Sequence, residues 1–208
     1  MNISEIRNRL IAQYYDILEK CVRPLAQRGV SPNVISSVSL ILSFIAALFY
    51  AFGMIFMGGI TLLLSGFTDT VDGSVARITG QSTNYGALLD STLDRYAEFF
   101  IFFGLIIYFG NGWMVAVVLL ALMGSIMVSY IKARAESLGQ TRLVGMMQRP
   151  ERLVLLSLGS LLNTPVGRRY PECPDCVLAV TLILLAVLSN ITALQRLISG
   201  KKDLKQSE

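Results

Sequence analysis

The feature that most constrains this chain is a series of long apolar stretches. An α-helix needs about 20 mainly apolar residues to cross the hydrocarbon core of a bilayer, which is roughly 30 Å thick. Six stretches approach or exceed this length, at 33–53, 55–78, 86–109, 113–135, 150–167 and 175–198. Only 15% of the residues are charged, whereas a soluble domain has about 25%. The sequence therefore predicts an all-α polytopic membrane protein with six transmembrane helices.

The segment before the first apolar stretch has a different pattern. Between residues 4 and 28, apolar residues recur at helical spacing and charged residues fill the rest of the circumference. This pattern predicts an amphipathic helix that lies in the membrane interface. Gly29 ends it, and Ser31 and Pro32 suit the N-cap and first position of the next helix. We therefore divide the chain into an amphipathic helix (1–30), a six-helix transmembrane domain (31–200) and a cytosolic tail (201–208).

The basic residues predict the orientation. With a cytosolic amino terminus, only Arg168 and Arg169 of the 18 Lys and Arg residues fall on the outer side. Lys and Arg concentrate in cytosolic loops, so we expect both termini to lie in the cytosol. We expect the membrane to be the inner membrane of the cell. The basic residues border apolar helices and form no continuous stripe, which argues against nucleic acid as a partner.

Two pairs of aspartates interrupt the second and third apolar stretches near one end. Asp69 and Asp72 are three residues apart, and Asp90 and Asp94 are four apart, so each pair shares one face of a helix. A short polar loop at 79–85 makes the two helices antiparallel neighbours. We therefore expect the four carboxylates to converge at the cytosolic ends of these helices, where the active site would lie.

Four converging anions at membrane depth require cations to offset their charge. The chain has no histidine, and an all-oxygen ligand set favours hard divalent ions. The pattern predicts two ions, Mg²⁺ or Mn²⁺, that share bridging carboxylates. An acidic surface cap that contacts headgroups or water is the plainer alternative. A divalent-cation transporter is another, but it would need acidic groups near the membrane midplane, and the outer halves of these helices lack them.

The arrangement Asp69-x2-Asp72-Gly73-x2-Ala76-Arg77-x8-Gly86-x3-Asp90-x3-Asp94 resembles the signature of the CDP-alcohol phosphotransferase family at all eight fixed positions. The resemblance implies a homodimeric enzyme whose four aspartates hold two metal ions on the pyrophosphate of a CDP-linked lipid such as CDP-diacylglycerol. It also implies that Asp94 is the general base. The implied donor-binding residues are Asn33, Ser36, Asp72, Gly73, Ala76, Arg77 and Gly86.

A second group of residues concerns the acceptor. Basic residues end the fourth and sixth stretches and begin the fifth, which favours an anionic, phosphorylated acceptor. The runs Tyr-Ile-Lys-Ala-Arg-Ala-Glu at 130–136 and Arg-Pro-Glu-Arg at 149–152 resemble those of phosphatidylinositol-phosphate synthases. This resemblance implies transfer of a phosphatidyl or archaetidyl group to inositol 1-phosphate with release of CMP. The implied acceptor-binding residues are Ser129, Tyr130, Lys132, Arg134, Arg149, Arg152 and Arg196. Gln148 departs from the usual Glu, and glycerol 3-phosphate or another polar alcohol is the alternative acceptor.

Two of the three cysteines form a Cys-x-x-Cys pair, Cys173 and Cys176. Such a pair can be a redox motif or half of a zinc site. Without a second pair or a histidine, we expect it to be an incidental feature of a short loop.

Overall fold

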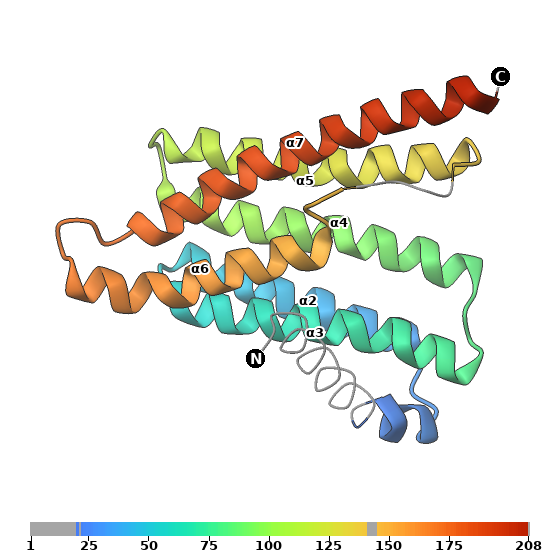
Figure 1. Cartoon of the computed structure of the whole chain (residues 1–208). Coiled ribbons are helices and arrows are strands. Elements are labelled where there is room, and N and C mark those ends of the chain that lie inside the picture. The colour runs from blue at the N-terminus through green and yellow to red at the C-terminus, as the bar shows by residue number, and fades with distance from the viewer. Residues whose placement is uncertain (1–19, 21, 141–144, 208) are drawn as a thin grey trace, which may run out of the picture.

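The computed structural model describes Lys20, residues 22–140 and residues 145–207, and every regular element within them is a helix. The helices are α2 (Pro32–Ala51), α3 (Ile55–Thr79), α4 (Asn84–Phe109), α5 (Met114–Ser137), α6 (Arg149–Arg169) and α7 (Cys176–Ser207), which run side by side as one bundle (Figure 1). Residues 22–27 are also helical. Most of the amphipathic helix predicted at 4–28 lies outside the described residues.

The six apolar stretches correspond to these six helices, most of them to within about two residues at either end. Ser31 is the N-cap of α2 and Pro32 follows it, as predicted, although the Ser31 side chain makes no capping hydrogen bond. By length and composition, α2, α5 and residues Cys176–Lys201 of α7 qualify as membrane spans among the described helices. In α3, α4 and α6, charged and polar residues lower the hydropathy. The all-helical prediction is thus confirmed, with three candidate membrane spans among the described helices, and six spans remain a prediction.

Helix α2 is the common partner of the two helices that carry the aspartates. The most extensive helix contacts join α2 to α3, α2 to α4, and α5 to α7. Helices α3 and α4 follow one another along the chain, yet each packs along α2 more extensively than on the other. The sequence predicted α3 and α4 as direct neighbours; α2 instead supports both, and the ends of α3 and α4 that carry the aspartates border a shared cavity.

Small and hydroxylated residues allow α2 to pack closely on both helices. A Cβ atom added at Gly104 of α4 would collide with the backbone of Ala47 on α2. Between α2 and α3, the Ser39 hydroxyl donates to the Ser65 carbonyl at 3.0 Å, and the Ser43 and Ser65 hydroxyls lie 2.7 Å apart. Hydrogen bonds of this kind contribute roughly 0.6 kcal/mol each between membrane helices. These contacts fix how α3 and α4 are aligned along α2.

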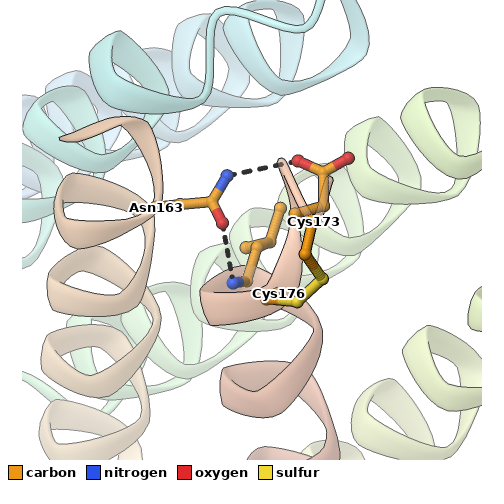
Figure 2. The surroundings of a disulfide bond; sticks show 5 residues. Asn163, Cys173 and Cys176 are labelled. Atoms are coloured by element: carbon orange, nitrogen blue, oxygen red, sulfur yellow. Dashed lines mark hydrogen bonds between the residues drawn. A yellow bond between two sulfur atoms is a disulfide. The ribbon is translucent and has the colours of Figure 1, made fainter. Parts of the chain in front are cut away.

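The connection between α6 and α7 contains a disulfide between Cys173 and Cys176, which corrects the expectation of an incidental cysteine pair. Figure 2 shows the Asn163 side chain of α6 beside it, donating to the Asp175 carboxylate at 3.2 Å and accepting from the Leu178 backbone N–H at 3.0 Å. The Tyr108 hydroxyl of α4 also donates to Asp175, at 2.9 Å. This loop therefore joins three helices, at the end of the bundle opposite the α3–α4 connection (Figure 1).

Candidate functional site

Three of the four predicted aspartates converge. Asp69 and Asp72 on α3 and Asp90 on α4 each offer a carboxylate oxygen, and these oxygens lie within 4.8 Å of one another. Asp72 is 4% exposed and accepts a hydrogen bond of 2.5 Å from the Ser36 hydroxyl on α2. Carboxylate oxygens from two helices at this spacing suit a hard divalent ion. The residues therefore fit the predicted metal, and Ser36 holds Asp72 in place through α2.

Asp94 lies one turn beyond Asp90 and is outside that group of three. It borders a narrow cavity that Asp69 and Asp90 also line, and Arg149 reaches into the same cavity from the first turn of α6. The Arg149 Nη1 atom is 2.7 Å from the Asp69 carboxylate and forms an ion pair with Asp94. Arg149, predicted to bind the acceptor, thus pairs with two of the site carboxylates.

Beside the carboxylates, a cavity of about 250 Å³ lies between α2, α3 and the start of α4. All of the predicted donor-binding residues line it, namely Asn33, Ser36, Asp72, Gly73, Ala76, Arg77 and Gly86. A Cβ atom at Gly73 would meet no atom within 4 Å, so this glycine leaves space in the cavity. The Arg77 guanidinium is oriented by the Ser74 hydroxyl, 3.1 Å away.

The loop before α4 completes this cavity and was missing from the predicted set. Gln81, Ser82 and Thr83 line the cavity wall. The Thr83 hydroxyl also caps α4 by accepting from the Gly86 backbone N–H at 2.9 Å. The polar composition of 79–85 could have pointed to these residues, since a cavity for a polar ligand needs hydrogen-bonding partners beyond the glycines.

Arg152 is held by a carboxylate that sequence reasoning did not single out. Its Nη2 atom lies 2.5 Å from Glu98 of α4, and its Nη1 atom donates to the Met147 carbonyl at 3.1 Å. Glu98 and Arg152 are each 4% exposed, and Arg95 approaches Glu98 at 3.4 Å. Glu98 lies one helical turn beyond Asp94, so its place on the aspartate face was the available signal.

Three arginines that were predicted to bind the acceptor retain unused donors. The Nε atoms of Arg149, Arg152 and Arg196 are buried and have no hydrogen-bond partner among the described residues. Arg196 of α7 is fixed by donating from Nη1 to the Val128 carbonyl at 2.7 Å. Buried donors without a partner are costly, and an anion that accepts from them would remove that cost.

The remaining predicted acceptor residues lie on two faces of α5. Lys132 is exposed and pairs with Glu136 at 3.8 Å, and the Ser129 hydroxyl donates to the Ser125 carbonyl at 3.3 Å. Tyr130 and Arg134 instead line a separate groove between α5 and α7, which Arg196 also borders. The predicted acceptor residues therefore do not all gather in one place.

Comparison with known proteins gives concordant results. Residues 29–194 match the family model described as CDP-alcohol phosphatidyltransferase. The chain is 34% identical over 195 residues to archaetidylinositol phosphate synthase of Methanothermobacter thermautotrophicus, covering 93% of this chain and 95% of the relative.

Among solved structures, the chain resembles phosphatidylinositol phosphate synthase of Mycobacterium tuberculosis. For the crystal structure with CDP-DAG bound, the TM-score is 0.76 at 33% identity, covering 89% of this chain and 94% of the other. The structure of that enzyme in complex with manganese and citrate also gives a TM-score of 0.76 at 33% identity, with 88% of each chain covered.

Proposed function

The chain belongs to the CDP-alcohol phosphatidyltransferase family, and from this premise we propose that it transfers the phosphatidyl or archaetidyl group of a CDP-linked lipid to inositol 1-phosphate, with release of CMP. The observation that carries this proposal is the cavity of about 250 Å³, which borders Asp72 and Asp90 and is lined by every predicted donor-binding residue. The names of the two relatives support inositol phosphate as the acceptor.

The metal belongs at the carboxylates. Asp69, Asp72 and Asp90, joined by Asp94, would hold two divalent ions, Mg²⁺ or Mn²⁺. When bound, these ions would neutralise the pyrophosphate and stabilise CMP as a leaving group. The crystal structure of the relative with manganese supports this assignment. The Ser36 hydrogen bond directs the Asp72 carboxylate toward the other two.

The remaining residues have roles in binding and proton transfer. Asn33, Ser36, Asp72, Gly73, Ala76, Arg77 and Gly86 bind the cytidine diphosphate. Asp94 takes the proton from the acceptor hydroxyl, whose oxygen then attacks the lipid-bearing phosphorus as the bond to the CMP oxygen breaks. Arg149 holds Asp94 through their ion pair, so the carboxylate is positioned before the acceptor arrives.

The acceptor phosphate would be bound by the buried arginines. Arg152 and Arg196 have unused Nε donors, and guanidinium groups form strong, directional hydrogen bonds with phosphate. Lys132 lies near the carboxyl-terminal end of α5 and would add a further cation. Glycerol 3-phosphate also offers a hydroxyl and a phosphate and is the second candidate acceptor, although it has fewer hydroxyls to occupy the site.

We further propose six membrane spans, with both termini and the carboxylates on the cytosolic side and a homodimer as the assembly. The disulfide supports this orientation, because disulfides persist in oxidising compartments and Cys173–Cys176 lies at the end of the bundle opposite the α3–α4 connection. The same topology divides the chain into an amphipathic helix (1–30), a transmembrane catalytic domain (31–200) and a cytosolic tail (201–208).

The test is CMP release by the purified protein in detergent, with CDP-diacylglycerol or its ether-linked archaeal counterpart as donor. Release that needs both Mg²⁺ or Mn²⁺ and inositol 1-phosphate is the expected result. If CMP is released with glycerol 3-phosphate but not with inositol 1-phosphate, the proposed reaction type stands and the proposed acceptor is wrong. No release with either acceptor and either donor, from protein with intact helical circular dichroism, would refute the proposal.

A further inference from the structure

A series of alternating charges leads away from the aspartates along α4. Arg95 lies between two carboxylates of this helix, with its Nη2 atom 3.5 Å from Asp94 and its Nη1 atom 3.4 Å from Glu98. Glu98 in turn pairs with Arg152 of α6 at 2.5 Å. The two carboxylate oxygens of Glu98 therefore face different arginines, Oε2 toward Arg95 and Oε1 toward Arg152. The charge network consists of Asp94, Arg95, Glu98 and Arg152.

Glu98 is buried but lies outside the cavities of the proposed reaction. It is 4% exposed, and it lines neither the donor cavity nor the narrow cavity beside Asp94. A buried carboxylate is costly to desolvate, and replacing a buried ion pair with apolar residues is often neutral or stabilising. Stability alone therefore gives little reason for a carboxylate at this position, whereas a role in the reaction gives a specific one.

Glu98 determines how the Arg152 guanidinium is turned. One Nη atom of Arg152 is bound by Glu98, and the other donates to the Met147 carbonyl at 3.1 Å. The Nε atom is buried and has no hydrogen-bond partner in the described part of the chain. With both Nη atoms fixed, Nε is the donor left for an anion. Loss of the Glu98 contact would let the guanidinium rotate and would misdirect this donor.

Arg95 extends the same restraint to Asp94. The Nε and Nη1 atoms of Arg95 and the Oε2 atom of Glu98 form no hydrogen bond with any described residue. Arg95 is therefore held between its two anions by charge and not by short hydrogen bonds. Without the charge of Glu98, Arg95 would be drawn toward Asp94 alone, and the guanidinium and the Asp94 carboxylate would shift together.

We propose that Glu98 is a positioning residue for the transfer reaction. It orients Arg152 for the acceptor phosphate and, through Arg95, holds the Asp94 carboxylate in place for the acceptor hydroxyl. This inference rests on the proposed function, in which Arg152 binds the phosphate and Asp94 takes the proton. Glu98 contacts neither substrate, and it links the groups that recognise the two ends of one acceptor molecule.

Kinetics of CMP release test this proposal. Glu98→Gln should raise the acceptor KM about tenfold, as expected when a hydrogen bond between charged groups is lost. It should also lower kcat about tenfold, because Asp94 is misplaced. The donor KM should stay unchanged, since Glu98 lies outside the donor cavity. Glu98→Asp keeps the charge on a shorter side chain and should show smaller changes in the same directions. Glu172→Gln, at an exposed carboxylate between α6 and α7, is the matched control and should have the kinetics of the parent.

Double-mutant cycles assign each effect to its partner. In an Arg152→Gln background, Glu98→Gln should no longer raise the acceptor KM. In an Arg95→Gln background, it should no longer lower kcat. Parent values of both constants in Glu98→Gln, with only a lower melting temperature, would overturn the proposal and leave a purely structural ion pair. Additive effects in both backgrounds would also overturn it. If Glu98→Gln does not fold, the same criteria apply to Glu98→Asp.

The parent protein tests the proposed function separately. An active parent whose kinetic constants do not respond to Glu98→Gln would refute this inference and leave the proposed function intact. If the parent uses only glycerol 3-phosphate, the acceptor assignment is wrong, and the KM for glycerol 3-phosphate decides the role of Glu98. No CMP release with either acceptor would refute the proposed function and this inference together.

Discussion

The Nη1 atom of Arg149 lies 2.7 Å from both carboxylate oxygens of Asp69. The same atom pairs with Asp94, so one guanidinium on α6 joins α3 to α4. Asp69 and Asp94 would otherwise repel each other in a partly buried site. Arg149 therefore contributes to the arrangement of the carboxylates, in addition to any contact with the acceptor phosphate.

Arg149→Gln is expected to lower turnover by about 10²-fold, because the proposed base loses the charged donor that positions it. The acceptor KM should rise less than kcat falls. Arg149→Lys keeps the charge but offers a single ammonium, so it should recover part of the turnover. Steady-state CMP release measures both parameters. A higher acceptor KM at unchanged kcat would instead place Arg149 wholly in acceptor binding.

Asp94→Asn should abolish turnover and largely spare binding of the CDP-linked donor. The amide cannot accept the acceptor proton, whereas Asp69, Asp72 and Asp90 are unchanged and converge without it. Donor affinity can be measured by calorimetry in detergent with Mn²⁺ present. Turnover close to that of the parent protein would remove Asp94 as the general base.

Arg152→Gln should raise the acceptor KM far more than the donor KM, and it should also destabilise the protein. Removal of one partner of a buried ion pair costs about 3–5 kcal/mol, and Glu98 would retain only its longer contact with Arg95, at 3.4 Å. Adding Glu98→Gln should restore most of the thermal stability while the acceptor KM stays high. If the double variant regains acceptor affinity as well, Arg152 does not contact the acceptor.

Gly73→Val should fold normally and raise the donor KM. A Cβ atom at Gly73 meets nothing within 4 Å, so the branched side chain would extend into the donor cavity without disturbing a helix contact. Gly112→Ala, in the α4–α5 turn, is the matched control and should leave the donor KM unchanged. Unaltered donor kinetics in Gly73→Val would mean that the nucleotide binds elsewhere.

Replacing Cys173 and Cys176 with serine should lower stability by about 2 kcal/mol, as expected for a disulfide that closes a short loop. Turnover should be preserved, because the loop lies at the opposite end of the bundle from the α3–α4 connection. In intact cells, a membrane-impermeant maleimide should label these cysteines only after treatment with an impermeant reductant. Labelling that requires permeabilised cells would reverse the proposed orientation.

The sequence predicted the helices well because their determinants are local. The length of each apolar stretch predicts a helix, and the N-cap and first-turn residues Ser31 and Pro32 mark where α2 begins. Spacing along a single helix also predicted the aspartate faces, and a loop of a few residues predicted that the two faces would meet.

What the sequence did not predict depends on side chains brought together from distant helices. Arg149 and Arg152 were predicted as acceptor ligands from the resemblance of their sequence run, and the ion pairs that they form with carboxylates of α4 were not predicted. Glu98 was overlooked although its spacing of four residues from Asp94 continues the aspartate face, because its partner Arg152 comes from a distant helix. The cysteine pair was read as incidental, and only the turn geometry before α7 brings the two sulfurs together.

The contact between Gly104 and Ala47 has a consequence for how the site can change over time. Gly104 lies ten residues beyond Asp94 on α4, which corresponds to about 15 Å along the helix axis. Because the two backbones meet there, α4 cannot slide along α2 without breaking that contact. The contact therefore fixes the position of α4 along the axis of α2, and with it the level at which Asp90 and Asp94 face the aspartates of α3. Substitutions in the apolar part of the bundle can therefore shift the site carboxylates relative to one another and change the reaction rate, without altering any residue that contacts a substrate.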